Sequence, residues 1–170
     1  GAFSFSPDHE KLAYSVDPDG TEKCVIYIKD LTTGEHYPEE IPNTSGDVYD
    51  HKGVEWATDN HTIFYLTLDT ALRPHKLYRH VIDTDPQKDQ LLFHESDETY
   101  FLFVGKTRSG AYITSHSQST LTDEWRILPA DQPTGEFTVF QPRTQRLEYK
   151  IDHLRNKFYI ITNDEALNFR

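Results

Sequence analysis

Ile63-Phe64-Tyr65-Leu66 is a short apolar run between polar turns, and similar runs return at nearly constant spacing along the chain. Counted at their tyrosines, the runs are 51, 47 and 47 residues apart: Leu12-Ala13-Tyr14-Ser15, Ile63-Phe64-Tyr65-Leu66, Gly110-Ala111-Tyr112-Ile113 and Lys157-Phe158-Tyr159-Ile160. Runs of this length are too short for helices, and side chains that are apolar on both faces suit a strand in a covered sheet. The spacing predicts repeated β-strands, with the four tyrosines at equivalent places.

Other short strands surround each run. A strand ending near Phe5, Trp56, Phe103 or Ile151 precedes it, and third and fourth strands follow in three units: Val25–Ile28 and His36–Tyr37, Lys76–Arg79 and Leu91–Phe93, Glu124–Ile127 and Phe137–Phe140. Pro38 and Pro142 lie in or beside the fourth strands, where an outer edge tolerates a missing N–H. Four short antiparallel strands recurring every 40 to 50 residues or so are typical of β-propeller blades.

Composition favours the same fold class. The chain has 18 Thr, 10 Tyr and 10 Phe against 7 Ala, and it shows no convincing amphipathic helix longer than about two turns. We therefore expect an all-β chain forming a partial β-propeller of about three and a half four-stranded antiparallel blades. The expected blades span about residues 1–49, 50–98 and 99–146, and a partial blade spans 147–170. Propellers close at roughly 4 to 8 blades, so this one would be incomplete.

Charge and cysteine content exclude several classes of partner. Seventeen Lys and Arg against 28 Asp and Glu give a net charge of −11, which argues against nucleic acid or an anionic membrane surface. No stretch approaches the roughly 18 apolar residues of a membrane span. The single cysteine, Cys24, excludes an internal disulfide framework and a multi-cysteine metal site. We expect a cytoplasmic protein, and the absence of Met suggests a segment of a longer chain.

Four specific stretches carry a family resemblance that covers essentially the whole chain. They are Leu72–His80, Asp97–Tyr100, His116–Glu124 and Phe158–Asp164 through Asn168–Arg170. Together they resemble the oligopeptidase B (protease II) branch of the prolyl oligopeptidase family of serine peptidases. The resemblance implies a seven-bladed propeller that caps a C-terminal α/β-hydrolase domain, with this chain in the middle of the propeller and the hydrolase domain absent. The stretch Asp47–Gly53 looks longer than the usual connection before an inner strand.

Catalytic residues are not expected in this chain. The family's catalysis needs a Ser on a G-x-S-x-G elbow, followed in chain order by Asp and His, because the Oγ must be exposed beside backbone oxyanion donors. No G-x-S-x-G occurs in the sequence. Ser115-His116-Ser117 lacks the flanking glycines and is interpreted as a turn at a strand end. The candidate catalytic, cofactor-binding and metal-binding lists are all empty.

Several polar motifs have simple structural interpretations. Nine His residues show no H-E-x-x-H spacing, and His75 and His80, an odd number apart, would point to opposite faces of a strand. We expect them to be solvated or locally hydrogen-bonded. The other expectations are a hairpin tip at Asp17–Glu22 rather than a calcium loop, a buried Cys24, and solvated faces at Glu39-Glu40 and Glu95–Glu98. No cofactor is expected, since no glycine-rich phosphate loop opens a helix.

Two functional hypotheses remain. The resemblance implies part of the propeller of an endopeptidase that cuts short peptides after Arg or Lys, the propeller gating the route and excluding folded proteins. Its partners would be short basic peptides and the hydrolase domain of the same protein. The alternative is a non-enzymatic propeller used as a binding scaffold, because one fold hosts many functions; a dipeptidyl-peptidase relative matches the specific stretches less well. Open blade faces would favour self-association of the excised chain.

Overall fold

The computed structural model describes residues 2–46, 53–166 and 168–170, and the stretch 47–52, for which a long connection is expected, lies outside them. Every regular element in the described part is a β-strand, apart from the single 3-10 turn η1 (Pro86–Lys88). Within the same residues, no helix is long and apolar enough to cross a membrane. The expectation of an all-β chain is confirmed.

The strands form successive antiparallel meanders. The first meander contains β1 (Phe3–Phe5), β2 (Lys11–Val16), β3 (Cys24–Asp30) and β4 (His36–Thr44). The second contains β5 (Val54–Trp56), β6 (Thr62–Leu68), β7 (Pro74–Val81) and β8 (Gln90–His94), with η1 between β7 and β8. A pairing of Thr44 with Thr67 joins β4 to β6.

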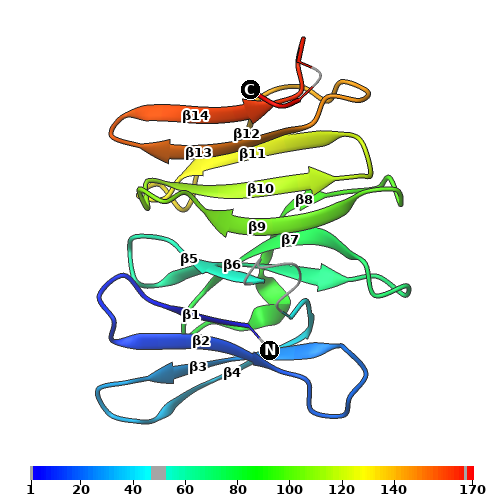
Figure 1. Cartoon of the computed structure of the whole chain (residues 1–170). Coiled ribbons are helices and arrows are strands. Elements are labelled where there is room, and N and C mark those ends of the chain that lie inside the picture. The colour runs from blue at the N-terminus through cyan, green and yellow to red at the C-terminus, as the bar shows by residue number, and fades with distance from the viewer. Residues whose placement is uncertain (1, 47–52, 167) are drawn as a thin grey trace.

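The same strand order continues toward the C-terminus. The third meander contains β9 (Phe101–Lys106), β10 (Tyr112–Gln118), β11 (Asp123–Pro129) and β12 (Thr138–Val139), and the hairpin of β13 (Tyr149–Leu154) and β14 (Lys157–Thr162) follows. The meanders stack in chain order, with connections at both ends of the strands (Figure 1). All the expected third and fourth strands are present, and Pro38 lies within β4. The exact blade limits stay a prediction.

The hairpins correct the predicted register at two of the four tyrosines. Tyr14 and Tyr65 are equivalent, because each lies opposite a residue eleven positions earlier, Phe3 and Val54. In the third meander, however, the Thr107 N–H donates to the Tyr112 carbonyl, as Ser6 donates to Lys11 and Ala57 to Thr62 in the first two. Tyr112 therefore matches Lys11 and Thr62, three residues before its predicted place. Tyr159 lies opposite Asp152, only seven positions earlier. The predicted equivalence of Tyr112 and Tyr159 to the first two tyrosines is wrong. The backbone hydrogen bond that closes each hairpin therefore defines which residues are equivalent between meanders, and the position of the tyrosine does not.

The hydrophobic core lies between the meanders. Ile63 and Tyr65 of β6 belong to a cluster with buried side chains of the first meander, including Ile26, Ile28 and Ile41. The alternating residues Phe64 and Leu66 face a second cluster, shared with the third meander, that includes Leu102, Ile113 and Leu128. A third cluster joins Trp125 to Tyr149 and Ile151. Strand β6 is thus buried on both faces, as its uniformly apolar sequence indicated.

Trp56 links the first two meanders. Its side chain is fully buried, and its Nε1–H donates to the Ser4 carbonyl at 2.9 Å. Replacing Trp56 with Phe leaves that carbonyl without its donor and opens space beside it, so we expect a loss of about 2–4 kcal/mol in unfolding free energy. Urea unfolding measures the loss. The control Tyr159→Phe changes an exposed ring and should stay within about 0.5 kcal/mol; equal losses in the two variants would contradict the prediction.

Candidate functional site

A network of charged side chains lies between the second and third meanders, beside the strand ends where β8 ends and β9 and β11 begin. Glu95, expected in a solvated face, is only 3% exposed, which corrects the sequence interpretation; Asp97 and Glu98 of the same stretch are exposed. The Glu95 N–H donates to the His75 carbonyl, and its carboxylate accepts from the Asp97 N–H at 3.2 Å. Burial of a carboxylate requires a paired cation, which comes from a distant loop.

Arg143 supplies that cation from the segment between β12 and β13. One guanidinium nitrogen donates to Glu95 Oε2 at 2.6 Å and reaches Glu124 Oε1 at 3.4 Å. Its guanidinium carbon lies 3.7 Å from the centre of the Tyr100 ring, within the range of a cation–π contact. Glu124 Oε2 also accepts the Arg143 backbone N–H at 3.0 Å. The loop after β12 is thereby fixed to the ends of three strands.

Two further arginines complete this network. Arg126 pairs with Glu124, donates to Ser117, and has its guanidinium carbon 3.7 Å from the centre of the Phe93 ring. Arg73 pairs with Asp69 at 2.9 Å and donates to three backbone carbonyls in the connection between β8 and β9, those of Glu95, Asp97 and Tyr100. We call Arg73, Glu95, Glu124, Arg126 and Arg143 the charge network.

The electrostatics of this network favour the ionised carboxylate. Burial acts to raise the pKa of Glu95, but hydrogen bonds from Arg143, Ser117 and the Asp97 N–H outweigh it and hold the pKa below its ordinary value. Burial lowers the pKa of Arg126, against the attraction of Glu124. These side chains bond mainly to one another, so the arrangement fixes loops and does not present a reactive group.

The segment Ser115-His116-Ser117 lies inside β10 and is buried, so its interpretation as a turn is wrong. Its backbone is paired on both edges, with β9 and with β11. His116 Nε2 lies 2.7 Å from Asp123 Oδ1, and its ring stacks on Trp125 with centroids 4.0 Å apart. Asp123 also accepts the Tyr149 N–H at 3.0 Å. This group therefore joins the third meander to the final hairpin.

One Ser–His contact has the spacing of a catalytic pair. The Ser109 hydroxyl lies 2.8 Å from His153 Nδ1, and the Ser109 N–H donates to the His153 carbonyl. The neighbouring carboxylate of Asp152 accepts the backbone N–H groups of Arg108 and His153 instead of orienting the ring. A nucleophile of this type needs its base oriented by a third group. The contact is a tie between neighbouring hairpins.

A second polar cluster lies between β4 and β7. His80 is fully buried, with Nδ1 2.8 Å from Asp89 Oδ1 and Nε2 3.5 Å from Glu39 Oε1. The Tyr65 hydroxyl donates to Asp89 Oδ2 at 2.8 Å, and burial raises the pKa of Tyr65, which keeps that donor protonated. Glu39 is 5% exposed, so its expected solvation is wrong, whereas Glu40 is exposed. The missed signal was alternation, because Glu39 shares a strand face with buried Ile41.

The Asp17–Glu22 stretch and Cys24 lie as predicted. The Asp17–Glu22 stretch connects β2 to β3, with the Asp17 carboxylate accepting the N–H groups of Gly20, Thr21 and Glu22. Cys24 is buried. Throughout the described ranges, no three His, Cys, Asp or Glu side chains gather closely enough to hold a metal ion.

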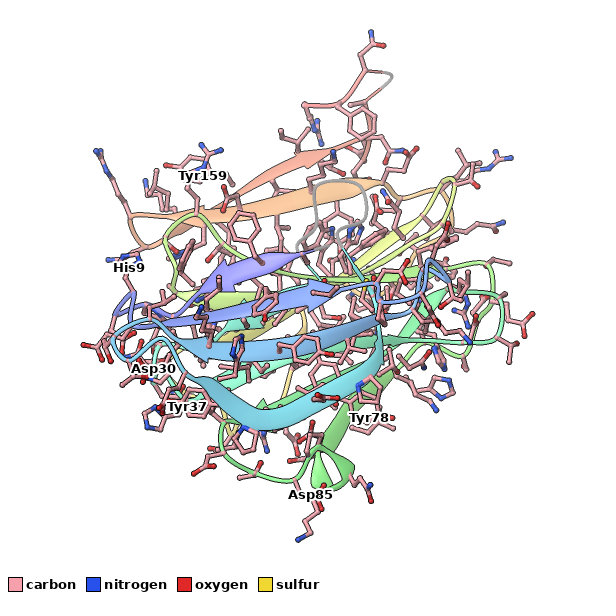
Figure 2. The ribbon with its side chains drawn as sticks, turned by 90° about the horizontal axis from the view of Figure 1, so that it is seen from below. His9, Asp30, Tyr37, Tyr78, Asp85 and Tyr159 are labelled. Atoms are coloured by element: carbon pink, nitrogen blue, oxygen red, sulfur yellow. The ribbon has the colours of Figure 1, made fainter. Side chains whose placement is uncertain are left out.

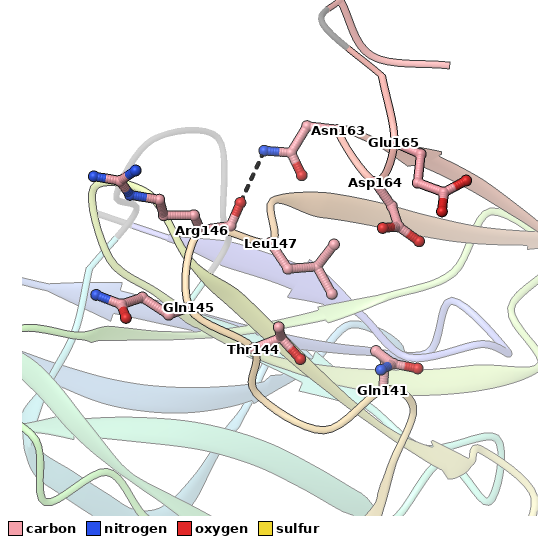
Figure 3. Close-up of a pocket in the computed structure, with 8 residues that line it drawn as sticks. All are labelled: Gln141, Thr144, Gln145, Arg146, Leu147, Asn163, Asp164 and Glu165. Atoms are coloured by element: carbon pink, nitrogen blue, oxygen red, sulfur yellow. Dashed lines mark hydrogen bonds between the residues drawn. The ribbon is translucent and has the colours of Figure 1, made fainter.

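Two concave regions lie at the surface. A polar pocket of about 280 Å³ lies between the connection that precedes β13 and the turn after β14 (Figure 3). Asn163 Nδ2 donates across it to the Arg146 carbonyl at 3.0 Å, and Asp164 and Glu165 line the same side. A larger groove of about 430 Å³ lies between β4 and η1, next to the His80 cluster. Neither lining contains a Ser, Cys or His side chain.

Antiparallel meanders stacked face to face, with buried ties between them, define an incomplete β-propeller. All of residues 1–170 match the family described as prolyl oligopeptidase, N-terminal β-propeller domain. The chain therefore belongs to the prolyl oligopeptidase family and forms part of its N-terminal propeller, which confirms the predicted fold.

Individual relatives agree with the resemblance to oligopeptidase B. The chain is 38% identical to Protease 2 of Moraxella lacunata over 96% of this chain and 23% of that protein. It is 34% identical to dipeptidyl aminopeptidase BI of Pseudoxanthomonas mexicana over 100% of this chain and 23% of that protein. Oligopeptidase B of Leishmania major superposes with a TM-score of 0.84 at 24% identity, over 96% of this chain and 23% of that one. The chain thus spans about a quarter of these relatives.

The pKa of Glu95 leads to a pH-dependent prediction. Because the folded-state pKa is lowered, the carboxylate stabilises the fold above the unfolded pKa of about 4.5, and this stabilisation disappears as pH falls through the folded value. We expect Glu95→Gln to cost about 2 kcal/mol at pH 7 and almost nothing below the lowered pKa. Urea unfolding from pH 3 to 7 measures this. Exposed Glu98→Gln is the control, and a loss for Glu95→Gln that is independent of pH would refute the assignment.

Proposed function

We propose that this chain is part of the propeller of an oligopeptidase B-like serine endopeptidase that cuts short peptides after Arg or Lys. The observation that carries the proposal is the 38% identity to Protease 2 across 96% of the chain. In this proposal the chain is non-catalytic, and it helps to gate the route and to exclude folded proteins. Its partners are short basic peptides and an α/β-hydrolase domain of the same protein, and the enzyme works in the cytoplasm.

Two structural properties support this role. Several polar side chains of the described residues connect one meander to the next, such as Arg143 with Glu95 and Ser109 with His153, which suits a rigid barrier. The net charge of −11 creates a negative potential that attracts basic peptides. A scaffold without enzymatic activity is not favoured, because the family match extends over all 170 residues and belongs to peptidases.

The activity prediction compares the isolated chain with the intact natural protein that carries it. We expect the intact protein to hydrolyse Arg- and Lys-containing chromogenic peptides and to ignore the equivalent peptides with Phe or Pro before the cut. The isolated 170-residue chain should be inactive, because its sequence contains no G-x-S-x-G elbow. Activity of the isolated chain that survives repurification and is blocked by a serine-directed inhibitor would contradict this division, and Pro specificity of the intact protein would contradict the proposed substrate.

Gating is tested separately, through the charge network. Glu95→Gln loosens the hold of Arg143 on the strand ends, so in the intact protein we expect faster cleavage of peptides of about 30 residues relative to a tetrapeptide. The unchanged tetrapeptide rate shows that the variant is folded, and Glu98→Gln serves as the matched control. An unchanged ratio between the cleavage rates of the long peptide and the tetrapeptide, in the natural protein and in both variants, would argue against a gate at this place.

Self-association of the isolated chain is a further expectation. Phe3 and Phe5 of β1 are 60% and 47% exposed, and Tyr159 and Ile161 of β14 are 54% and 57% exposed. Exposed apolar sheet faces promote association. We expect concentration-dependent oligomers in sedimentation, a shift toward monomer in Phe5→Lys with Ile161→Lys, and no shift in the loop control Leu121→Lys. A single, cooperatively folded monomer at every concentration would contradict the expectation.

A further inference from the structure

The groove of about 430 Å³ at the outer rim has a mixed apolar and acidic lining. One wall comes from β4, at Glu40, Ile41 and Pro42, and the other comes from the connection that contains η1, at Asp85 and Pro86. Figure 2 shows Tyr78 and Asp85 at the same outer edge of the molecule, beside β4. The groove lies at the rim, whereas the charge network lies at the strand ends where β8 finishes.

Two tyrosine rings form the floor of this groove. Tyr65 and Tyr78 pair directly across β6 and β7, and their rings stack with centroids 5.6 Å apart and planes 16° apart. Tyr65 is 4% exposed, and Tyr78 remains partly accessible from the groove. The face of an aromatic ring attracts cations, most strongly where water is excluded. The floor therefore favours a flat or cationic group.

The charge around the floor is negative. Glu40, Asp85 and Asp89 line the groove, and the lining contains no Lys or Arg. Asp89 already bonds Tyr65 and His80, and Asp85 accepts the Gln87 N–H, but Glu40 is exposed. Glu39, which lies on the other side of the His80 ring from Asp89, does not line the groove. The lining therefore holds three carboxylates and no cationic side chain.

We propose that this rim groove binds the arginine side chain of a peptide. The guanidinium would stack on Tyr78 and pair with Glu40 and Asp85, while its aliphatic stem packs on Ile41, Pro42 and Pro86. A metal ion fits less well, since no compact set of metal-binding side chains is found among the described residues. The planar guanidinium matches a stacked aromatic floor better than the compact, strongly hydrated ammonium of lysine.

The site adds a second recognition point for basic peptides and does not depend on the proposed peptidase activity. Its test is binding of N-acetyl-arginine methylamide to the intact natural protein, measured by calorimetry after treatment with a covalent serine-directed inhibitor. The inhibitor blocks any active-site binding. Hydrolysis of chromogenic peptides, measured in parallel without the inhibitor, reports on the proposed function alone, so either idea can fail while the other stands.

The matched probe is the citrulline analogue, which keeps the shape of arginine and removes its charge. We expect it to bind at least about tenfold more weakly than the arginine probe, and Glu40→Gln with Asp85→Asn to weaken the arginine probe by a similar factor. Asn at position 85 keeps an acceptor for the Gln87 N–H. Tyr78→Leu should cost about threefold by removing the ring face. Exposed Glu98→Gln, in the connection between β8 and β9 and outside the groove, should change little.

Four outcomes would overturn the proposal. They are equal binding of the two probes, an unchanged affinity in the Glu40→Gln, Asp85→Asn variant, an equal loss in the Glu98→Gln control, and no saturation up to about 10 mM probe, a concentration at which even weak sites fill. An equal loss in the control would assign the effect to the overall charge of the protein. Retained tetrapeptide hydrolysis shows that each variant is folded.

Discussion

Burial of the second meander on both faces is the constraint on which the structure depends. Ile63 and Tyr65 face the first meander while Phe64 and Leu66 face the third, so neither face of the run 63–66 meets water. Every polar group in such a strand must find its partner inside the protein, because an unpaired buried group costs about 1–3 kcal/mol. The positions of the polar clusters follow from this requirement.

Those clusters connect segments that are far apart in sequence. Arg143 reaches Glu95 across 48 residues, Ser109 meets His153 across 44, and the Asp8 N–H donates to the Asn60 side chain across 52. Buried ion pairs add little net stability compared with apolar packing, but removal of one partner is costly. Their effect is therefore to set how each meander packs on the next.

The local pattern of the sequence predicted the strands well and the polar partners badly. The run 63–66 showed its two buried faces directly, and Asp17–Glu22 and Cys24 lie as expected. Glu39 and Glu95 were interpreted as solvated because their partners, His80 of β7 and Arg143 of the segment after β12, are distant in sequence and leave no local signal. Tyr112 was placed three residues away from its true equivalents because identical side chains were aligned, whereas the hairpin closures fix the register.

The repeat also shows which side-chain contacts recur in successive meanders and which contacts differ at the rim. Tyr14 lies opposite Tyr27 and Tyr65 opposite Tyr78, so the same cross-strand pair occurs in two meanders. In the first meander the Tyr14 hydroxyl meets His36, whereas in the second the Tyr65 hydroxyl meets Asp89. The second and third strands are thus repeated, and the connection to the fourth strand brings a different partner each time. Because loops tolerate change that buried strands do not, an acidic rim groove can arise between the first and second meanders without disturbing the buried packing.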